Sequence, residues 1–395
     1  MMMQIKDVLR RIGLITRREL RYFSRRPLLL FTIVLAPLIC TVFFVSLMDK
    51  GLPTDLPAAI VDEDNTNITH IIVRTIDALE ETNICRSYAS FSEARQAMQR
   101  GEIYAFFYIS RGTTEEALAN RQPRISFYTN EAFFVPGSLL MKDFRTASEL
   151  CGLALTRETL YARGATEDHA MAVIQPIILE THPLNNSALD YSVYLSNMLV
   201  PGIIILLIML ATSYSIGMEW KNGTQRLLYR LSGESPTIAL IGKLIPQTIV
   251  FTLIFVFVDV LFFEYLRFPC QCGLPTMILL GFVTVLASQA FGVFFFGVFL
   301  GKMRLAMCLC SLWGILSFSV AGFTYPVMAM SPIFQVLSSL FPLRHYYLIY
   351  VNQALNGYAL SSVLPSIVML MAFIVTPVLF MRRYRTAFLK YKYQK

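Results

Sequence analysis

The residues whose types and spacing are most suggestive of chemistry lie in one short stretch, 219–235, directly after a long uncharged run. Its candidate site residues are Glu219, Lys221, Gly223, Thr224, Arg226 and Arg230. Glu219 can charge the start of a short helix, and Gly223 permits a sharp backbone turn. The basic side chains can then contact an acidic groove of a partner. An ordinary loop stopped by glycine explains the same spacing, so the stretch alone leaves both interpretations open.

Elsewhere the chain lacks a convergent set of His, Asp, Glu or Ser side chains at one face. Its four histidines show no metal-ligand spacing: they are His70, His169, His182 and His345. Three successive acids, Asp62, Glu63 and Asp64, end an expected strand and point in different directions, which favours a structural role over cation binding. We therefore expect no metal site, no catalytic site and no enzyme activity in this chain.

Two acids fall inside an apolar run. An acid within a membrane span is costly and often functional. Glu264 stands three residues before Arg267 and can pair with it on one helical face. Asp259 is less easily explained, so it remains a candidate for a substrate path or a proton-transfer role, although a structural role is favoured.

Composition and charge distribution indicate which parts of the chain cross the membrane. The 395-residue chain is 55% hydrophobic and 15% charged, whereas soluble domains are about 25% charged. Four short segments together hold 20 Lys/Arg and 4 Asp/Glu: 1–27, 219–243, 301–304 and 382–395. The long segment 49–190 instead holds 12 Lys/Arg and 20 Asp/Glu. Because short basic segments beside spans stay in the cytoplasm, the net charge of +8 indicates membrane orientation and no nucleic-acid partner.

The apolar runs predict a multi-pass α-helical membrane protein with six transmembrane helices and both termini cytoplasmic. A single large α/β domain, extracytoplasmic, is inserted between spans 1 and 2. The expected organisation is an amphipathic interface helix in 1–26, span 1 in 27–48, the α/β domain in 49–190, spans 2–6 in 191–381, and a basic cytoplasmic tail in 382–395.

The N-terminal segment has apolar residues at helical spacing, from Ile5 to Ile15, with arginines on its other faces. The relevant arginines include Arg17, Arg18 and Arg21. Such a basic amphipathic helix can lie on the inner membrane surface. It serves either as an anchor alone or as a docking element for a cytoplasmic partner.

The inserted domain alternates strand and helix patterns. Strands are expected at 57–64, 84–88, 102–110 and 124–130, and helices at 65–81, 92–100 and 134–162, with Ser90 or Ser92 as a helix cap. Cys85 and Cys151 both lie in it and could pair.

The uncharged run Leu305–Leu343 is 39 residues long, more than one crossing needs. Gly322 and Pro326 interrupt it near its middle, and Pro342 lies near its end. Irregular backbone at membrane depth must be buried in protein. We therefore expect an outer re-entrant or interfacial segment at 324–345, built as a pair of short helices.

This layout resembles the permease of a type-2 class ABC (ATP-binding-cassette) exporter, in the drug-export-like branch with a large external domain. The resemblance covers nearly the whole chain. The charged N-terminal helix, Glu219-x-x-x-Gly223-Thr224 and the GFTYPVMAMSP segment carry it. It implies that the stretch 219–235 is the coupling element that touches the ATPase, and that a periplasmic adaptor protein is a further partner. The family commonly has more acids after the glutamate than Trp220-Lys221-Asn222.

The chain contains no G-x-x-x-x-G-K-[ST] motif, because Gly242-Lys243 is followed by Leu and Gly301-Lys302 by Met. ATP and magnesium are therefore expected in a separate ATPase subunit. Six spans are few for a closed path, which predicts a second permease subunit, identical or related. The expected location is the cell membrane, the inner membrane in a Gram-negative host.

Two alternatives remain. A mechanotransmission protein would let the ATPase move the external domain with no substrate crossing the bilayer, but such proteins usually have four spans. A membrane enzyme or receptor would need a convergent site or a sizeable cytoplasmic signalling domain, and the sequence has neither.

Overall fold

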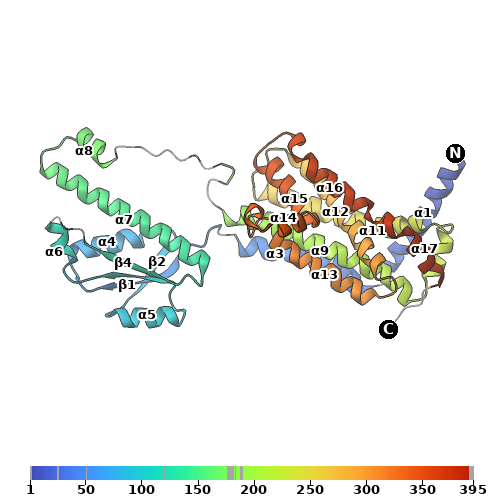
Figure 1. The fold of residues 1–395 in the computed structure, drawn as a ribbon, viewed down its shortest axis with the longest axis horizontal. Coiled ribbons are helices and arrows are strands. Elements are labelled where there is room, and N and C mark those ends of the chain that lie inside the picture. The colour runs from blue at the N-terminus through green and yellow to red at the C-terminus, as the bar shows by residue number, and fades with distance from the viewer. Residues whose placement is uncertain are drawn as a thin grey trace. The chain divides into compact units, whose positions relative to one another are not determined.

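The computed structural model describes residues 2–24, 26–49, 51–119, 121, 123–175, 182, 184–186 and 190–390. These residues form two compact units (Figure 1). The membrane unit comprises Met1–Asp49 and Pro183–Lys395, and the α/β unit comprises Lys50–His182.

The α/β unit is built on a four-stranded sheet with strand order β2-β1-β3-β4. Its strands are β1 (Leu56–Asp62), β2 (Thr82–Ser87), β3 (Ala105–Ile109) and β4 (Ile125–Thr129). Strand β1 pairs in parallel with β2 and β3, and β4 runs antiparallel to β3. Its helices are α4 (Asn67–Asp77), α5 (Phe91–Gln99), α6 (Thr113–Leu118), α7 (Phe134–Ala162) and α8 (Glu167–Ile174).

Both faces of the sheet are covered, as the unbroken apolar character of β1 requires. Ala58 and Ile60 belong to one core with residues of α4 and α7, whereas Ala59 and Val61 belong to a second core with residues of α5. Figure 1 shows α5 on the opposite side of the sheet from α4 and α7. Successive side chains of β1 therefore pack into different cores, one on each face of the sheet.

Local signals explain where the helices of this unit begin. Thr66 forms a capping box with Thr69 at the start of α4, and Ser90 accepts a hydrogen bond from the Glu93 amide at the start of α5. The four strands and three helices that the pattern predicts are all present, with boundaries shifted by a few residues. Helices α6 and α8 were not predicted. The Cys85 and Cys151 thiols are unpaired, so the possible disulfide between them is not formed.

Six helical segments among the described residues are long and apolar enough to cross a membrane, which is the number that the sequence predicts. They are Pro27–Leu47, Tyr191–Lys221, Pro236–Tyr265, Leu274–Val298, Met303–Val320 and Leu360–Lys390. Their elements are α2 (Pro27–Leu30), η1 (Phe31–Leu35), α3 (Ala36–Leu47), α9 (Tyr191–Lys221), α11 (Pro236–Asp259), η2 (Val260–Tyr265), α12 (Leu274–Val298), α13 (Met303–Val320), η5 (Leu360–Val363), α16 (Leu364–Val375), η6 (Thr376–Phe380) and α17 (Met381–Lys390).

Helix α9 lies at the centre of the membrane unit and packs against both α12 and α13. Small residues allow the close approach. A Cβ atom at Gly292 of α12 would stand 3.0 Å from the Met209 carbonyl oxygen of α9, and one at Gly314 of α13 would stand 2.3 Å from a Leu206 methyl group. Glycine is therefore required where these helices cross.

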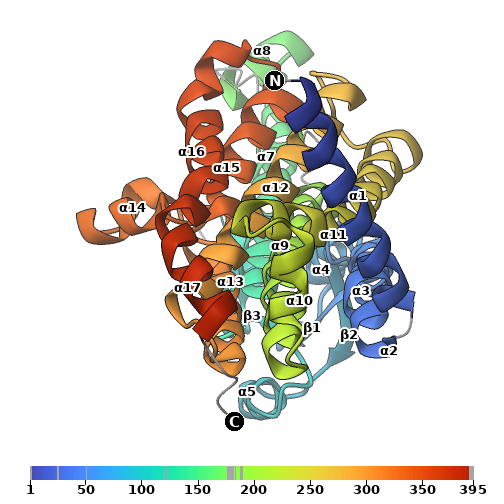
Figure 2. The ribbon, with the colours of Figure 1, turned by 90° about the vertical axis from the view of Figure 1, so that its right-hand side faces the viewer.

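The other helices described in the unit are α1 (Met2–Ser24), α10 (Gln225–Leu231), η3 (Val327–Ala329), α14 (Pro332–Ser338), α15 (Pro342–Tyr350) and η4 (Val351–Leu355). Helices α1, α10 and α17 lie at one end of it, as Figure 2 shows.

The broken segment after α13 contains three short helices, η3, α14 and α15, and α15 continues past the expected end of the segment at 345. Its outer re-entrant or interfacial position stays a prediction. Gly322 has φ +110°, a conformation that side-chain-bearing residues rarely adopt. Pro326 precedes η3, and Pro342 begins α15. Arg344 of α15 donates a hydrogen bond to the Ala321 carbonyl, 3.1 Å away, and so ties α15 to the end of α13.

The predicted pairing of Glu264 with Arg267 is wrong. Helix η2 ends at Tyr265, and Arg267 has φ +55°, so the two residues do not share a helical face. Among the described residues neither one forms an ion pair.

Candidate functional site

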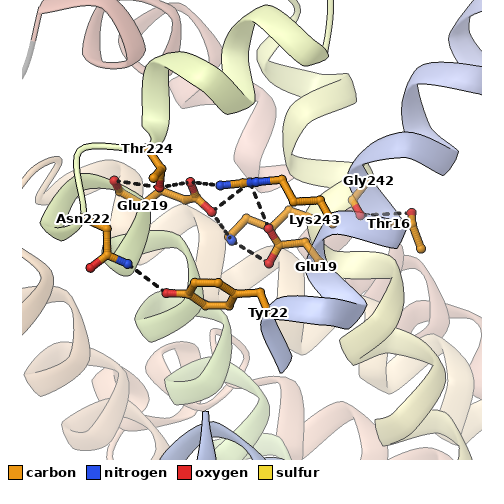
Figure 3. Close-up of polar contacts among 9 residues, drawn as sticks. Thr16, Glu19, Tyr22, Glu219, Asn222, Thr224, Gly242 and Lys243 are labelled. Atoms are coloured by element: carbon orange, nitrogen blue, oxygen red, sulfur yellow. Dashed lines mark hydrogen bonds and ion pairs between the residues drawn. The ribbon is translucent and has the colours of Figure 1, made fainter. Parts of the chain in front are cut away.

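Four charged side chains from three helices meet inside the membrane unit (Figure 3). Arg18 and Glu19 come from α1, Glu219 comes from the last turn of α9, and Lys243 comes from the second turn of α11. We call these four residues the ion cluster. Glu19 and Lys243 are fully buried and Glu219 is 2% exposed. Unpaired charges could not be buried in this way.

The cluster alternates cations and anions. The Arg18 guanidinium donates to both Glu219 carboxylate oxygens, at 2.9 and 3.1 Å. Lys243 Nζ lies 2.8 Å from Glu219 Oε1 and 2.9 Å from Glu19 Oε2. Arg18 is also 3.1 Å from Glu19 Oε1. The two positive and two negative charges cancel, and the bidentate contact gives the directional strength of an Arg–carboxylate pair.

The turn after α9 completes the surroundings of Glu219. Gly223 has φ +72°, and this reverses the chain so that α10 begins at Gln225. The Thr224 hydroxyl donates to Glu219 Oε2 over 2.6 Å, and its amide donates to the Glu219 carbonyl over 2.9 Å. The first turn of the connection is therefore fixed to the same carboxylate that binds Arg18 and Lys243.

This geometry corrects the expected role of Glu219 at the start of the short helix. The N-cap residue of α10 is Thr224, and the Glu219 carboxylate points toward α1 and α11. Two cations outcompete the weaker attraction of a helix N-terminus.

Helix α1 is packed into the protein along one face. A Cβ atom at Gly242 would stand 2.9 Å from the Ile15 Cβ atom, and Thr16 donates a hydrogen bond to the Gly242 carbonyl over 3.1 Å. Ile15 is fully buried. The close approach at Gly242 is what brings Glu19 within reach of Lys243, the next residue along α11.

The surroundings of α1 shift the pKa values of three of its side chains. Burial raises the pKa of the Glu19 carboxyl, although Lys243 opposes the shift. Burial also raises the pKa of Tyr22, whose hydroxyl accepts a hydrogen bond from Asn222 over 3.0 Å. The pKa of Arg18 is raised because Glu219 outweighs the opposing effect of burial.

A protein-family model described as an ABC-2 family transporter protein matches residues 27–381. The chain belongs to this family. It is thus a membrane permease component of an ABC transporter, a multi-pass protein of a family that is not itself catalytic and that associates with an ABC ATPase. A search of curated proteins finds no match. Helix α1, with Arg18 and Glu19, precedes the matched range.

Helix α10 of the permease has one buried face and one exposed face. Leu228 and Tyr229 are buried in a core with Trp220 and Phe388, and the Tyr229 and Phe388 rings stack with centroids 5.4 Å apart. The exposed residues around the turn and on α10 include Lys221, Arg226, Leu227 and Arg230. Arg226 also donates to the Leu389 carbonyl of α17 over 3.0 Å.

The predicted site residues thus divide into two groups. Arg18, Glu219 and Thr224 are brought together in the ion cluster and its turn. Arg17 and Arg21 are exposed on α1, on the same end of the permease as the exposed side chains of α10. Glu19 and Lys243 were not predicted. Two features of the sequence could have identified them: Glu19 is an acidic residue among the arginines of α1, and Lys243 is a single lysine within the apolar helix α11.

Asp259 and Glu264 lie far along α11 and η2 from the ion cluster. Asp259 is 2% exposed, and its Oδ2 atom has no hydrogen-bond partner in the described part of the chain. Glu264 is exposed. Within the described ranges no ion pair involves Asp259, and its path or proton role stays a prediction.

The acids at 62–64 stabilise turns. Asp62 Oδ1 accepts hydrogen bonds from the amides of Asp64 and Asn65, and Asp64 accepts them from Gly112 and Thr114 at 2.8 and 2.9 Å. Hydrogen bonds from Thr114 lower the pKa of Asp64. Within the described residues no cluster of three or more His, Cys, Asp or Glu could hold a metal ion.

Proposed function

We propose that the permease is the translocating subunit of an ATP-driven exporter, and that the ion cluster transmits the movement of a separate ATPase from α10 to the membrane-spanning helices. In the proposed orientation the end with α1, α10 and α17 faces the cytoplasm. The α/β unit then lies on the opposite side of the membrane, because a single span separates it from the basic N-terminal segment that the positive-inside rule keeps in the cytoplasm.

The observation that supports this proposal best is the position of the ion cluster relative to α10. Glu219 is five residues before Thr224, and both belong to one hydrogen-bonded group with α1 and α11. Removing one partner of a buried ion pair costs about 3–5 kcal/mol. The three helices therefore resist separation, and a displacement of α10 moves α9, α11 and α1 together.

The exposed side of α10 supplies a surface for the ATPase. Lys221 and Arg230 are exposed and suit an acidic groove, while exposed Leu227 offers an apolar contact between them. Opposite charge at such an interface speeds association and selects the partner. ATP and magnesium bind in the ATPase under this proposal, because the permease sequence lacks a phosphate-binding loop.

The complete transporter contains two permease subunits, identical or related, with the path between them. Export is the direction that the type-2 resemblance implies. A periplasmic adaptor that contacts the α/β unit belongs to the same proposal, as does an inner-membrane location in a Gram-negative host. No observation favours the mechanotransmission alternative over this one.

The test is purification of tagged permease from its native host in mild detergent, followed by mass spectrometry. We expect an ABC ATPase to co-purify with the parent chain and to be reduced at least tenfold in a Lys221→Glu/Arg230→Glu variant. The matched control, Lys302→Glu/Arg304→Glu, reverses two exposed charges at the start of α13, one at its N-cap and one in its first turn, and should retain the ATPase. Equal retention by both variants would exclude α10 as the contact surface.

A further inference from the structure

A groove of about 550 Å³ runs along the side of the membrane unit between α11, α12 and η6. We call it the lateral groove. Its volume lies in the range of small-molecule sites, roughly 300–1,000 Å³. Its lining residues are Thr237, Leu240, Ile241, Leu244, Ile245, Thr248, Ile249, Phe282, Leu286, Gln289, Ala290, Val293, Ile374, Pro377, Val378 and Met381.

The lateral groove is open toward the bilayer. Ile241, Ile249 and Phe282 are 47%, 54% and 39% exposed although all three are large and apolar. The lining of α11 extends from Thr237 to Ile249, which at 1.5 Å per residue is about 18 Å. The hydrocarbon of one leaflet is about 15 Å deep. The groove therefore extends from the membrane surface to near the bilayer centre.

One polar group lies deep in this apolar lining without enough partners. Gln289 is 3% exposed, its Oε1 atom is 2.7 Å from the Thr248 hydroxyl, and its Nε2 atom has no partner among the described residues. Thr248 Oγ1 also lies 3.0 Å from the Leu244 carbonyl. If the amide is turned over, Nε2 donates to Thr248 and one N–H still remains unpaired. In either orientation one N–H group of this buried lining amide has no partner among the described residues.

The chemistry of the lining defines the ligand. An unpaired N–H group in hydrocarbon is costly, and lipid tails carry no acceptor that could satisfy it. The groove has no charged lining residue, so an ion would lose its hydration without compensation. An uncharged apolar molecule with one acceptor oxygen satisfies both conditions.

We propose that the lateral groove binds an uncharged lipophilic molecule from the bilayer, whose acceptor oxygen pairs with the Gln289 amide. Leu240 and Val293 line the groove and also belong to the core that holds Trp220 and Tyr229 beneath α10. Any effect of the ligand on the coupling between the permease and an ATPase rests on the proposed function. The binding of the ligand does not.

The experiment is photolabelling of purified full-length permease in lipid nanodiscs with tritiated benzophenone, whose ketone is both acceptor and photoreactive group. We expect saturable labelling of the segments 237–249, 282–293 and 374–381. Loss of one net hydrogen bond corresponds to about a fivefold change in affinity. Gln289→Leu should therefore raise the half-saturating concentration about fivefold.

The chain offers a matched control in Gln247→Leu. Gln247 is fully buried on α11, its amide atoms also lack partners within the described chain, and it does not line the groove. This variant should leave the half-saturating concentration unchanged within about twofold. An equal effect of both variants would overturn the proposal, as would labelling that does not saturate or that falls outside the three segments.

A second comparison does not depend on any variant. On the parent chain, 1,3-diphenylacetone should displace the probe about five times better than 1,3-diphenylpropane, which has CH₂ in place of the carbonyl. Equal displacement would overturn the hydrogen bond to Gln289. Because no ATPase is present in this assay, its failure is separate from a failure of the proposed coupling to an ATPase.

Discussion

Lys243 is a fully buried ammonium group, and its two carboxylate partners come from two other helices, 224 and 24 residues away in the sequence. A buried charge keeps its ionised form only when neighbours replace the lost water. Glu19 and Glu219 do so at 2.9 and 2.8 Å. Each member of the ion cluster is therefore needed to neutralise the others.

The first prediction concerns this charge balance. Lys243→Met leaves two buried carboxylates with only Arg18, and should destabilise the permease by about 3–5 kcal/mol. The double variant Glu19→Gln/Lys243→Met restores neutrality and should be clearly more stable than Lys243→Met alone. Thermal unfolding in detergent measures both. A double variant no more stable than the single one would show that charge balance does not hold the cluster.

A second residue-scale prediction concerns pH. Burial, with a contribution from Glu81, raises the pKa of Asp143 in α7 from 3.8 to about 6. The folded α/β unit therefore holds more protons than the unfolded chain between about pH 4 and 6, so its stability should increase as the pH falls from 7 toward 5. Asp143→Asn should remove this dependence and raise the melting temperature at pH 8.

Calorimetry of the full-length chain between pH 5 and 8 tests this prediction. The range stays above the region where Glu81, whose pKa is lowered by its Asp143 hydrogen bond, has the opposite effect on stability. A pH slope that persists in Asp143→Asn would assign the proton to another group.

The sequence predicted less at this scale than at any other. Arg18 and Glu219 were selected as separate candidates, but nothing local places them 2.9 Å apart. Lys243 and Glu19 were missed, because their partners are set by how α1 packs on Gly242. Asp143 was missed because its environment also depends on tertiary packing: its hydrogen-bond partner, the Thr82 hydroxyl, lies on β2.

At the scale of the elements, helix crossings depend on particular glycines. Gly292→Ala would put a methyl group 3.0 Å from the Met209 carbonyl oxygen and 3.2 Å from its Cα. Because both are backbone atoms, α9 and α12 must move apart, at a cost of about 1–3 kcal/mol. The melting temperature of the detergent-solubilised permease should fall.

Gly13→Ala is the control for this prediction. It is the same substitution inside helix α1, where no atom lies within 4 Å of the added carbon. There alanine should raise the free energy of unfolding slightly, by about 0.5–1 kcal/mol, because it reduces the conformational entropy of the unfolded chain. Similar destabilisation by both substitutions would contradict the packing argument.

Most elements could be predicted from the sequence, since their signals are local. Uncharged runs define the six spans, and short runs rich in aromatic and β-branched residues define strands such as β3. Helix α6 was missed because its six residues follow Gly112 and carry two acids in the first turn, a pattern that also suits a loop. The break at Arg267 was missed because no glycine or proline marks its positive φ.

At the scale of the whole molecule, the proposed orientation places α10 and the α/β unit on opposite sides of the membrane. Cys85 is exposed in the α/β unit. In a chain whose other cysteines are replaced, a membrane-impermeant thiol reagent should label Cys85 in intact cells, or in spheroplasts of a Gram-negative host. In a variant that has Lys221→Cys and lacks Cys85, labelling should require permeabilisation. Labelling of both from the same side would contradict the orientation.

The central claim is that an ABC ATPase contacts the permease at α10, directly above the ion cluster. The most direct measurement places a photocrosslinking amino acid at Leu227, which is 52% exposed on α10, and separately at Leu253, which is 62% exposed within α11. We predict that Leu227 crosslinks to an ABC ATPase in native membranes and that Leu253 does not. Crosslinking of the ATPase from neither position, or equally from both, would contradict the account.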